Sequence, residues 1–237
     1  LVSNGGFETG GLSPWEVYTQ HSADEVSIRT SQPAGVGFSV SSPVDPPEGS
    51  YYLYTSKQTT SGTLAVRQFI QLGAIYDSSV LKAFSFQAIF EENAAARENL
   101  VALNFLLADQ KKHLIHYRFG SSGEPDFPTG LGLADKDTSV SLSMTQDITN
   151  TYLRDINEDT SHSSFFFDEI EIWLISDTTN AVSTDTLWDN FELTADIPPE
   201  ELLSTSDFAH VITTHPTASG FPFTISGSDD VLQVDLL

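Results

Sequence analysis

Seven residues near the end of the chain decide the fold: Leu187-Trp188-Asp189-Asn190-Phe191-Glu192-Leu193. In a strand over this stretch the odd-numbered residues share one face, so Asp189 stands in an otherwise apolar row that points inward. An acid that faces a core needs a partner, either a cation or a set of backbone N–H groups. The stretch therefore predicts a closing strand in which Asp189 is buried and bound to such a partner.

A second stretch lies near the start of the chain: Asn4-Gly5-Gly6-Phe7-Glu8-Thr9-Gly10-Gly11-Leu12-Ser13-Pro14-Trp15. It opens on a glycine-rich turn and places one acid, Glu8, among residues with flexible backbones. We predict that Glu8 and Asp189 meet around a calcium ion and so join the first and last strands of one β-sandwich. The alternative is that Asp189 accepts hydrogen bonds from the turn at residues 4–6.

Three features of these stretches carry a resemblance: the N-G-x-F-E start at residues 4–8, the Pro14-Trp15 pair and the W-D-N-F-x-L finish at residues 188–193. Over residues 1–196 the chain resembles the calcium-containing jelly-roll carbohydrate-binding modules, the family 4/9/22-like (CenC-like) group. The resemblance implies a galactose-binding-like jelly roll, a structural calcium ion and attachment to a glycan.

In the resembled family a G-x-Y-x-L strand lends backbone carbonyls to the calcium, and the matching strand here begins at Gly49-Ser50-Tyr51. The implied metal ligands are two carboxylates and three residues that contribute backbone oxygens: Glu8, Asp189, Phe7, Gly49 and Ser50. Calcium takes about six to eight oxygen ligands, so this set supplies most of them.

Charge and composition exclude several classes of function. The 237 residues include 33 acidic and 10 basic ones, for a formal net charge of −23, and no cysteine. Contacts to phosphate need clustered Lys and Arg, so we expect neither a nucleic acid nor an anionic membrane as partner. Without cysteine there is no disulfide framework and no thiolate metal site.

The start of the chain and its hydropathy favour an extracellular location. No apolar run approaches the roughly 18 residues that a membrane span needs. The chain begins with Leu1-Val2 and not with Met, which indicates a processed mature form. We therefore expect a secreted or cell-surface protein that does not insert into membranes.

Short alternating segments separated by turn residues predict an all-β chain. Strands are expected at residues 50–55, 63–72, 81–90, 100–108, 112–119, 140–144, 165–176 and 186–195. The segments 100–108 and 112–119 read as one hairpin, and 165–176 and 186–195 as a closing hairpin. Helical turns are expected at residues 91–98 and within 145–164, where Ile148, Tyr152 and Ile156 have helical spacing. The fold class predicted is a jelly-roll β-sandwich.

Composition changes after residue 196, so the chain is divided into a sandwich at 1–196 and a strand-like extension at 197–237. The extension contains no Lys or Arg and has strand-like segments at 209–213, 221–225 and 231–237. Its last segment alternates as a strand added to a sheet edge would. The extension either docks on its own sandwich or is exchanged with a neighbouring copy through residues 200–237.

Sugar binding needs exposed aromatic rings that stack on sugar faces beside polar groups that read hydroxyls. The candidates for glycan binding are Trp173, Tyr52, Tyr54 and Tyr117. Trp173 fits a core position equally well, because it alternates with Ile175. Trp15 and Trp188 lie inside the end motifs and are expected to pack in the core.

No enzyme signature is found: the chain has no G-x-S-x-G elbow, no P-loop and no H-E-x-x-H motif. Glu169 and Glu171 share a strand face, which a solvated face explains. We therefore predict a secreted, non-catalytic glycan-attaching protein with a structural calcium. The alternative is a structural subunit of an extracellular filament or surface assembly, held as a homo-oligomer by donation of the C-terminal strand.

Overall fold

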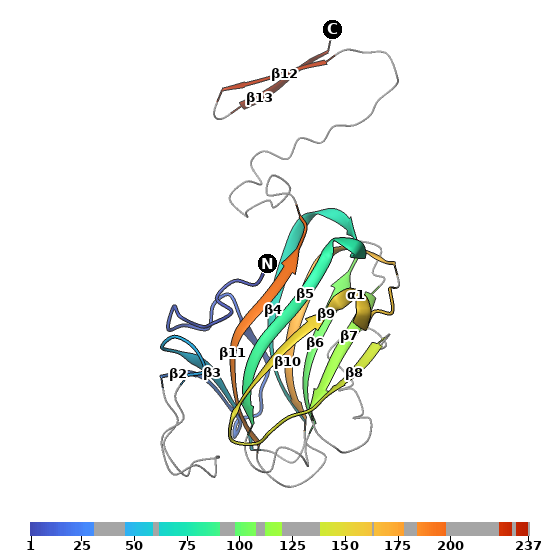
Figure 1. Cartoon of the computed structure of the whole chain (residues 1–237). Helices are drawn as coiled ribbons and strands as arrows, with labels where there is room; N and C mark the ends of the chain where they lie inside the picture. Colours follow the sequence, from blue (N-terminus) through green and yellow to red (C-terminus); the bar gives the residue numbers. More distant parts are fainter. Residues whose placement is uncertain are drawn as a thin grey trace. The chain divides into compact units, whose positions relative to one another are not determined.

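A computed structural model describes residues 1–30, 46–58, 62–90, 98–107, 112–119, 138–162, 164–177, 184–197, 223–228 and 231–236 (Figure 1). The chain divides into two units, Leu1–Ile197 and Pro198–Leu237. No helix in the described ranges is long and apolar enough to cross a membrane.

The first unit is a sandwich of two sheets, which confirms the predicted fold class (Figure 1). The six-stranded sheet holds, in spatial order, β1 (Glu16–Thr19), β4 (Thr63–Asp77), β10 (Phe166–Asp177), β6 (Glu98–Leu106), β7 (Lys112–Phe119) and β8 (Thr138–Leu142). The five-stranded sheet holds β2 (Glu25–Arg29), β3 (Tyr52–Lys57), β11 (Thr184–Ala195), β5 (Leu81–Phe90) and β9 (Thr149–Asp155). Two short helices, η1 (Ser78–Val80) and α1 (Ile156–Asp159), follow β4 and β9.

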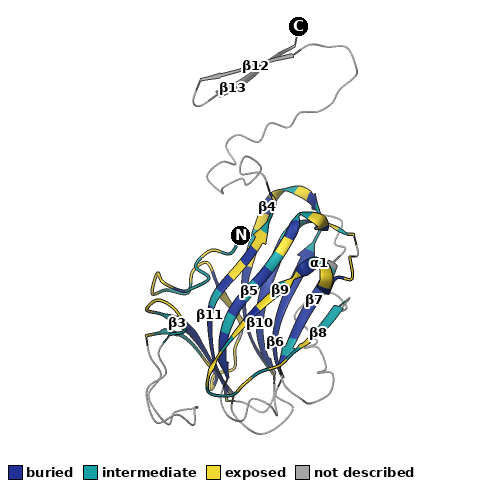
Figure 2. Ribbon diagram, viewed as in Figure 1, coloured by how far each residue is buried: buried dark blue, intermediate teal, exposed yellow. Residues whose placement is uncertain are grey.

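Residues of both sheets form one largely aromatic core. Buried positions run through both sheets of the first unit in Figure 2. Phe86 of β5 stacks on Phe191 of β11 with ring centroids 5.4 Å apart, and Phe84 stacks on Tyr117 of β7 at 5.8 Å. Trp15 and Trp188 are both buried in this core, as predicted. Burial of so much apolar surface is the main term that stabilises the sandwich.

Each sheet also has a smaller buried cluster on its outer face. On the six-stranded sheet this cluster consists of Ala65, Leu100, Ala102, Leu114, Trp173 and Ile175. On the five-stranded sheet it consists of Tyr52, Tyr54, Ile89 and Leu187. The outer faces are therefore not uniformly solvated, which the alternation of apolar residues alone does not reveal.

The predicted pairing of strands was confirmed for one of the two predicted hairpins and wrong for the other. β6 and β7 form the predicted antiparallel hairpin. β10 and β11 do not, because β10 pairs with β4 and β6 while β11 pairs with β3 and β5, in the other sheet. Of the helical turn predicted within residues 145–164, only α1 from Ile156 to Asp159 forms; Tyr152 lies in strand β9, and its ring packs on Phe86 at 4.9 Å. Of the helical turn predicted at 91–98, residues 91–97 lie outside the described ranges.

In the second unit, β12 (Phe223–Ser228) and β13 (Val231–Leu236) pair as an antiparallel hairpin. The strand-like segment predicted at 209–213 lies outside the described residues. Exchange of this unit with another copy stays a prediction.

Candidate functional site

Asp189 lies at a bulge in β11. The register of β11 against β5 shifts between Asp189 and Glu192, and Asn190 has a φ of 51°. The extra residue reverses the alternation, so Phe191 and Leu193 point into the central core while Leu187 joins the outer cluster. The prediction that one parity runs through the whole stretch was therefore wrong, because a bulge breaks the two-residue period.

The carboxylate of Asp189 is fully buried and is held by backbone N–H groups. Its Oδ2 accepts a hydrogen bond from the N–H of Glu48 at 3.1 Å, and its Oδ1 accepts one from Asn190 at 2.8 Å. The donors are therefore not those of the turn at residues 4–6. Burial raises the pKa of Asp189 from 3.8 to about 7, and the negative charges of Glu8 and Glu48 add to the shift.

Glu8 fastens the N-terminal turn to the segment that leads into β3. Its carboxylate accepts hydrogen bonds from the N–H groups of Ser50 at 3.0 Å and Tyr51 at 3.1 Å. Gly49 has a φ of +63°, and a Cβ on it would lie 2.2 Å from Glu8 Oε1. Only glycine fits there, because any side chain would occupy the space of the carboxylate.

The two acids meet at Gly6. A Cβ on Gly6 would lie 3.7 Å from Asp189 Oδ1 and 3.7 Å from the Cγ of Glu8. Two backbone hydrogen bonds hold the same junction, from Phe191 N–H to the Gly5 carbonyl at 3.0 Å and from the Leu1 amino group to the Leu193 carbonyl at 2.7 Å. The structure thus brings Glu8 and Asp189 together where the first and last segments of the sandwich join.

The other three predicted ligands are placed less directly for a metal. The Phe7 carbonyl accepts a hydrogen bond from Gly10 at 3.0 Å, and the Phe7 ring is buried in the core. Ser50 presents its N–H to Glu8, whereas the resemblance implies a carbonyl oxygen. In the described part of the chain, no three His, Cys, Asp or Glu side chains are grouped to hold a metal ion.

The donors at the junction nevertheless suit a hard cation. Glu8 and Glu48 each lie close enough to Asp189 for their negative charges to raise the pKa of its carboxyl group. Within the described ranges, no Lys, Arg or His forms an ion pair with any of them. Carboxylate and backbone oxygens without a neutralising cation are the chemistry that calcium prefers.

The structure corrects the glycan-binding prediction for the four aromatic residues. Trp173, Tyr52, Tyr54 and Tyr117 are at most 3% exposed, so none offers the open ring face that sugar stacking requires. Tyr117 lies in the central core and donates its hydroxyl to Asp159 at 3.0 Å. The other three belong to the outer clusters. Aromatic content marks strands well, but it does not tell a covered face from an open one.

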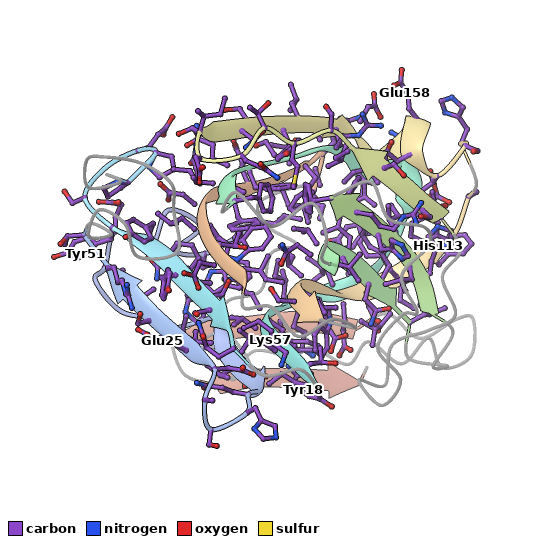
Figure 3. All side chains as sticks on the ribbon, turned by 90° about the horizontal axis from the view of Figure 1, so that it is seen from below. Tyr18, Glu25, Tyr51, Lys57, His113 and Glu158 are labelled. Atoms are coloured by element: carbon purple, nitrogen blue, oxygen red, sulfur yellow. The ribbon has the colours of Figure 1, made fainter. Side chains whose placement is uncertain are left out.

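Glu171 is not on a solvated face, contrary to the prediction. Its carboxylate accepts hydrogen bonds from Asn104 Nδ2 at 2.6 Å, Trp173 Nε1 at 3.1 Å and Arg67 Nη1 at 3.2 Å. The Arg67 guanidinium lies 5.3 Å from the ring centroid of Trp173 and 4.6 Å from that of Tyr18, and the two rings contact each other edge to face at 4.8 Å. These contacts form a polar network across four strands of the six-stranded sheet. Tyr18 lies at the rim of the molecule in Figure 3.

Comparison with known proteins gives structural likeness only. No family model matches the chain, and no curated protein matches it. The enzymatically active domain of bacteriophage CBA120 tailspike protein 4 is 14% identical with a TM-score of 0.44, over 82% of this chain and 21% of that one. TmCBM61 in complex with β-1,4-galactotriose is 15% identical with a TM-score of 0.44, over 82% of this chain and 97% of that one.

A family 11 carbohydrate-binding module from Clostridium thermocellum, in complex with a β-1,3-1,4-mixed-linked tetrasaccharide, is also similar. It is 13% identical with a TM-score of 0.42, over 79% of this chain and 92% of that one. We infer the function from the chain's own residues.

Proposed function

We propose that this chain is a secreted, non-catalytic carbohydrate-binding-module-like protein that attaches to a glycan or to cell-surface material. Its sandwich is closed by a structural calcium ion at the junction of Glu8 and Asp189. The observation that carries the proposal is a buried carboxyl group, Asp189, beside two further acids and without a cationic side chain among the described residues. A fully buried acid in such company is stabilised by a bound cation.

Calcium is the ion that fits these donors. Glu8 and Asp189 would supply carboxylate oxygens, Glu48 is a third acid whose charge acts on Asp189, and the carbonyls of residues 7, 49 and 50 are the backbone ligands that the resemblance implies. The ion would neutralise the repulsion among the acids. It would thereby fix the N-terminal turn to β3 and β11, which are neighbouring strands of the five-stranded sheet.

The glycan part of the proposal is supported by the uncovered part of the six-stranded sheet. Three aromatic residues on this face, Tyr18, Phe69 and Phe166, are 42%, 46% and 60% exposed. Exposed rings beside amide and carboxyl groups are the surface chemistry that recognises sugars. Sequence patterns missed these residues, since nothing in the alternation distinguishes an exposed aromatic from a buried one.

The metal is tested by thermal unfolding with added calcium and with a chelator. We expect calcium to raise the melting temperature of the wild-type protein, and we expect Asp189→Ala to lower that temperature and to remove its dependence on calcium. Glu158→Ala serves as the control, because Glu158 is exposed on α1, at the rim of the molecule in Figure 3, and far along the sequence from the junction. An unchanged calcium response in Asp189→Ala would rule out this site.

The glycan is tested by applying the purified chain to a glycan array with and without calcium. Binding to one class of glycan supports the proposal. If the protein is folded, as its melting temperature shows, and binds no glycan on the array, the proposal is refuted.

A second candidate function is favoured by one observation in the second unit. The β12–β13 hairpin is a two-stranded sheet, and such a sheet is marginally stable unless further strands or a packed face are added. A hairpin that completes a sheet of another copy would make the chain a subunit of an extracellular assembly.

A further inference from the structure

An open strip runs along the outer face of β4 and its neighbour β10. Phe69 and Ile75 of β4 point outward, because Ile70, Leu72 and Tyr76 between and beside them contact the central core. Phe166 of β10 also points outward, since the next residue, Phe167, is in the core and pairs with Tyr76. We call Phe69, Gln71, Ile75 and Phe166 the β4 strip. Its apolar members are 46–62% exposed.

The strip is distinct from the covered half of the same face. Trp173 pairs in register with Arg67 and is 1% exposed, whereas Glu169, four residues away on the same strand, pairs with the exposed Gln71. The face therefore changes from a closed cluster around Trp173 to an open surface past Phe69. Phe166 pairs with Asp77, which lies eight residues after Phe69 on β4. The strip is therefore up to about 26 Å long, at about 3.3 Å per residue.

The chemistry of the strip suits a polyhydroxylated chain. Exposed rings at its two ends offer faces for stacking, and the amide of Gln71 and the carboxyl of Glu169 lie between them as hydrogen-bond groups. A partner protein would be expected to need a larger unbroken apolar area than these separated side chains provide. The strip is long and narrow, which matches an extended chain.

Charge decides which kind of chain fits. Asp168 and Glu171 lie close enough to Glu169 for their charges to act on it, so carboxyl groups and not cations surround this part of the strip. Arg67, the cation that borders the strip, is already paired with Glu16 and Glu171. The whole chain carries a formal net charge of −23, so a polyanion is repelled at long range as well.

We propose that the β4 strip binds a glycan without acidic groups, with Phe69 and Phe166 as the rings that stack on it. This inference rests on the proposed glycan-binding function and names its site and its selectivity. The buried Trp173 takes no part in stacking and serves to close the neighbouring half of the face.

The test is titration calorimetry with a neutral oligosaccharide chosen from the array and with a uronic acid oligosaccharide of equal length. We expect Phe69→Ala and Phe166→Ala each to weaken binding of the neutral chain by roughly tenfold, an effect that the loss of one stacked ring would produce. Leu153→Ala is the matched control, since Leu153 is 72% exposed on the other sheet. We expect this control to bind like the wild type, and the uronic acid chain to bind weakly or not at all.

The outcomes separate the strip from the function. If a glycan binds and both phenylalanine variants bind it as the wild type does, the strip is wrong while the proposed function stands. If a uronic acid chain binds as tightly as the neutral one, the assigned selectivity is wrong. If no glycan binds, the proposed function itself fails. Light scattering on the same samples is a further check: a dimer that Phe166→Ala dissociates would assign the strip to a second copy of the chain.

Discussion

At the residue scale, Asp189 occupies a place where ionisation is unfavourable. Burial raises its pKa to about 7, because the ionised carboxylate is less stable inside the folded protein than it is in water. Glu8 and Glu48 increase the effect because like charges repel. Ionised Asp189 therefore destabilises the folded protein. A cation bound at the proposed site would relieve this cost, and the relief would add to the affinity for the cation.

We predict a falling melting temperature with rising pH in chelator-treated protein. Between about pH 4 and pH 7 the folded protein keeps a proton on Asp189 that the unfolded chain releases, so stability decreases as pH rises through this window. Asp189→Ala should flatten the fall, and Glu158→Ala should not. Melting temperatures measured by circular dichroism across the window check this. Equal slopes in wild type and Asp189→Ala would contradict it.

Gly49 allows a sharper test of Glu8. Gly49→Ala should weaken calcium binding, because the new Cβ would lie 2.2 Å from Glu8 Oε1 and displace the carboxylate. Gly62 is the matched control: its φ of +76° imposes similar backbone strain, but a Cβ there meets nothing within 4 Å. Calorimetric titration with calcium should therefore separate the two variants. Similar loss of affinity in both would show that strain alone is responsible.

At the scale of elements, the six-stranded sheet is tied across its outer face by Glu171. One carboxylate satisfies donors from β4, β6 and its own strand, through Arg67, Asn104 and Trp173. A single hydrogen bond adds little net stability, but a buried donor that loses its acceptor lowers the free energy of unfolding substantially. Removal of Glu171 should therefore cost more than the hydrogen bonds themselves contribute.

Glu171→Ala should therefore destabilise the first unit by about 2–3 kcal/mol, because Trp173 Nε1 and Asn104 Nδ2 would be left without an acceptor. For a domain of this size the melting temperature should fall by roughly 4–12 °C. Thermal unfolding checks this, with Glu169→Gln on the same strand face as the control. A fall of the same size in the control would show that the strand face as a whole, and not the network, is responsible.

The sequence predicted the positions of the strands better than it predicted which strands pair with one another. β4 and β5 follow from alternating apolar residues, and the β6–β7 hairpin follows from a short polar turn between two such runs. The separation of β10 from β11 into different sheets could not be predicted, because alternation carries no information on distant pairing. The bulge at Asn190 was missed for a related reason. It depends on a single residue with a φ of 51°, and positive φ also occurs in this chain at Phe7 and Ser161, so residue type alone does not locate it.

The candidate site shows the same limits. That Glu8 and Asp189 belong together followed from two motifs at the ends of the unit. The hydrogen-bond donors to Asp189 could not be predicted. They are the backbone N–H groups of Glu48 and Asn190, and a pattern of side chains does not indicate backbone donors. The buried state of Tyr52, Tyr54, Tyr117 and Trp173 depends on what covers each face, which only the tertiary structure determines.

At the scale of the whole molecule, the chain consists of a sandwich and a hairpin unit. If the hairpin joins copies, Val234→Pro should abolish assembly, because proline lacks an N–H and is excluded from paired strands. Negative-stain microscopy and light scattering on both proteins check this, with the unfolding temperature of the sandwich as the control. Monomeric wild-type protein would dismiss the assembly function.

The junction of Glu8 with Asp189 also bears on how the protein acquires its shape. The two positions are 181 residues apart (189 − 8), and the Leu1 amino group and the Gly5 carbonyl bind to β11 as well. Contacts of such long range must wait for loop closure, and they slow folding. The N-terminal turn can bind Ser50 and Tyr51 early in synthesis, but its contacts with β11 require the last strand of the sandwich. The attachment of the N-terminal turn is therefore completed by β11, the last strand of the sandwich to be synthesised.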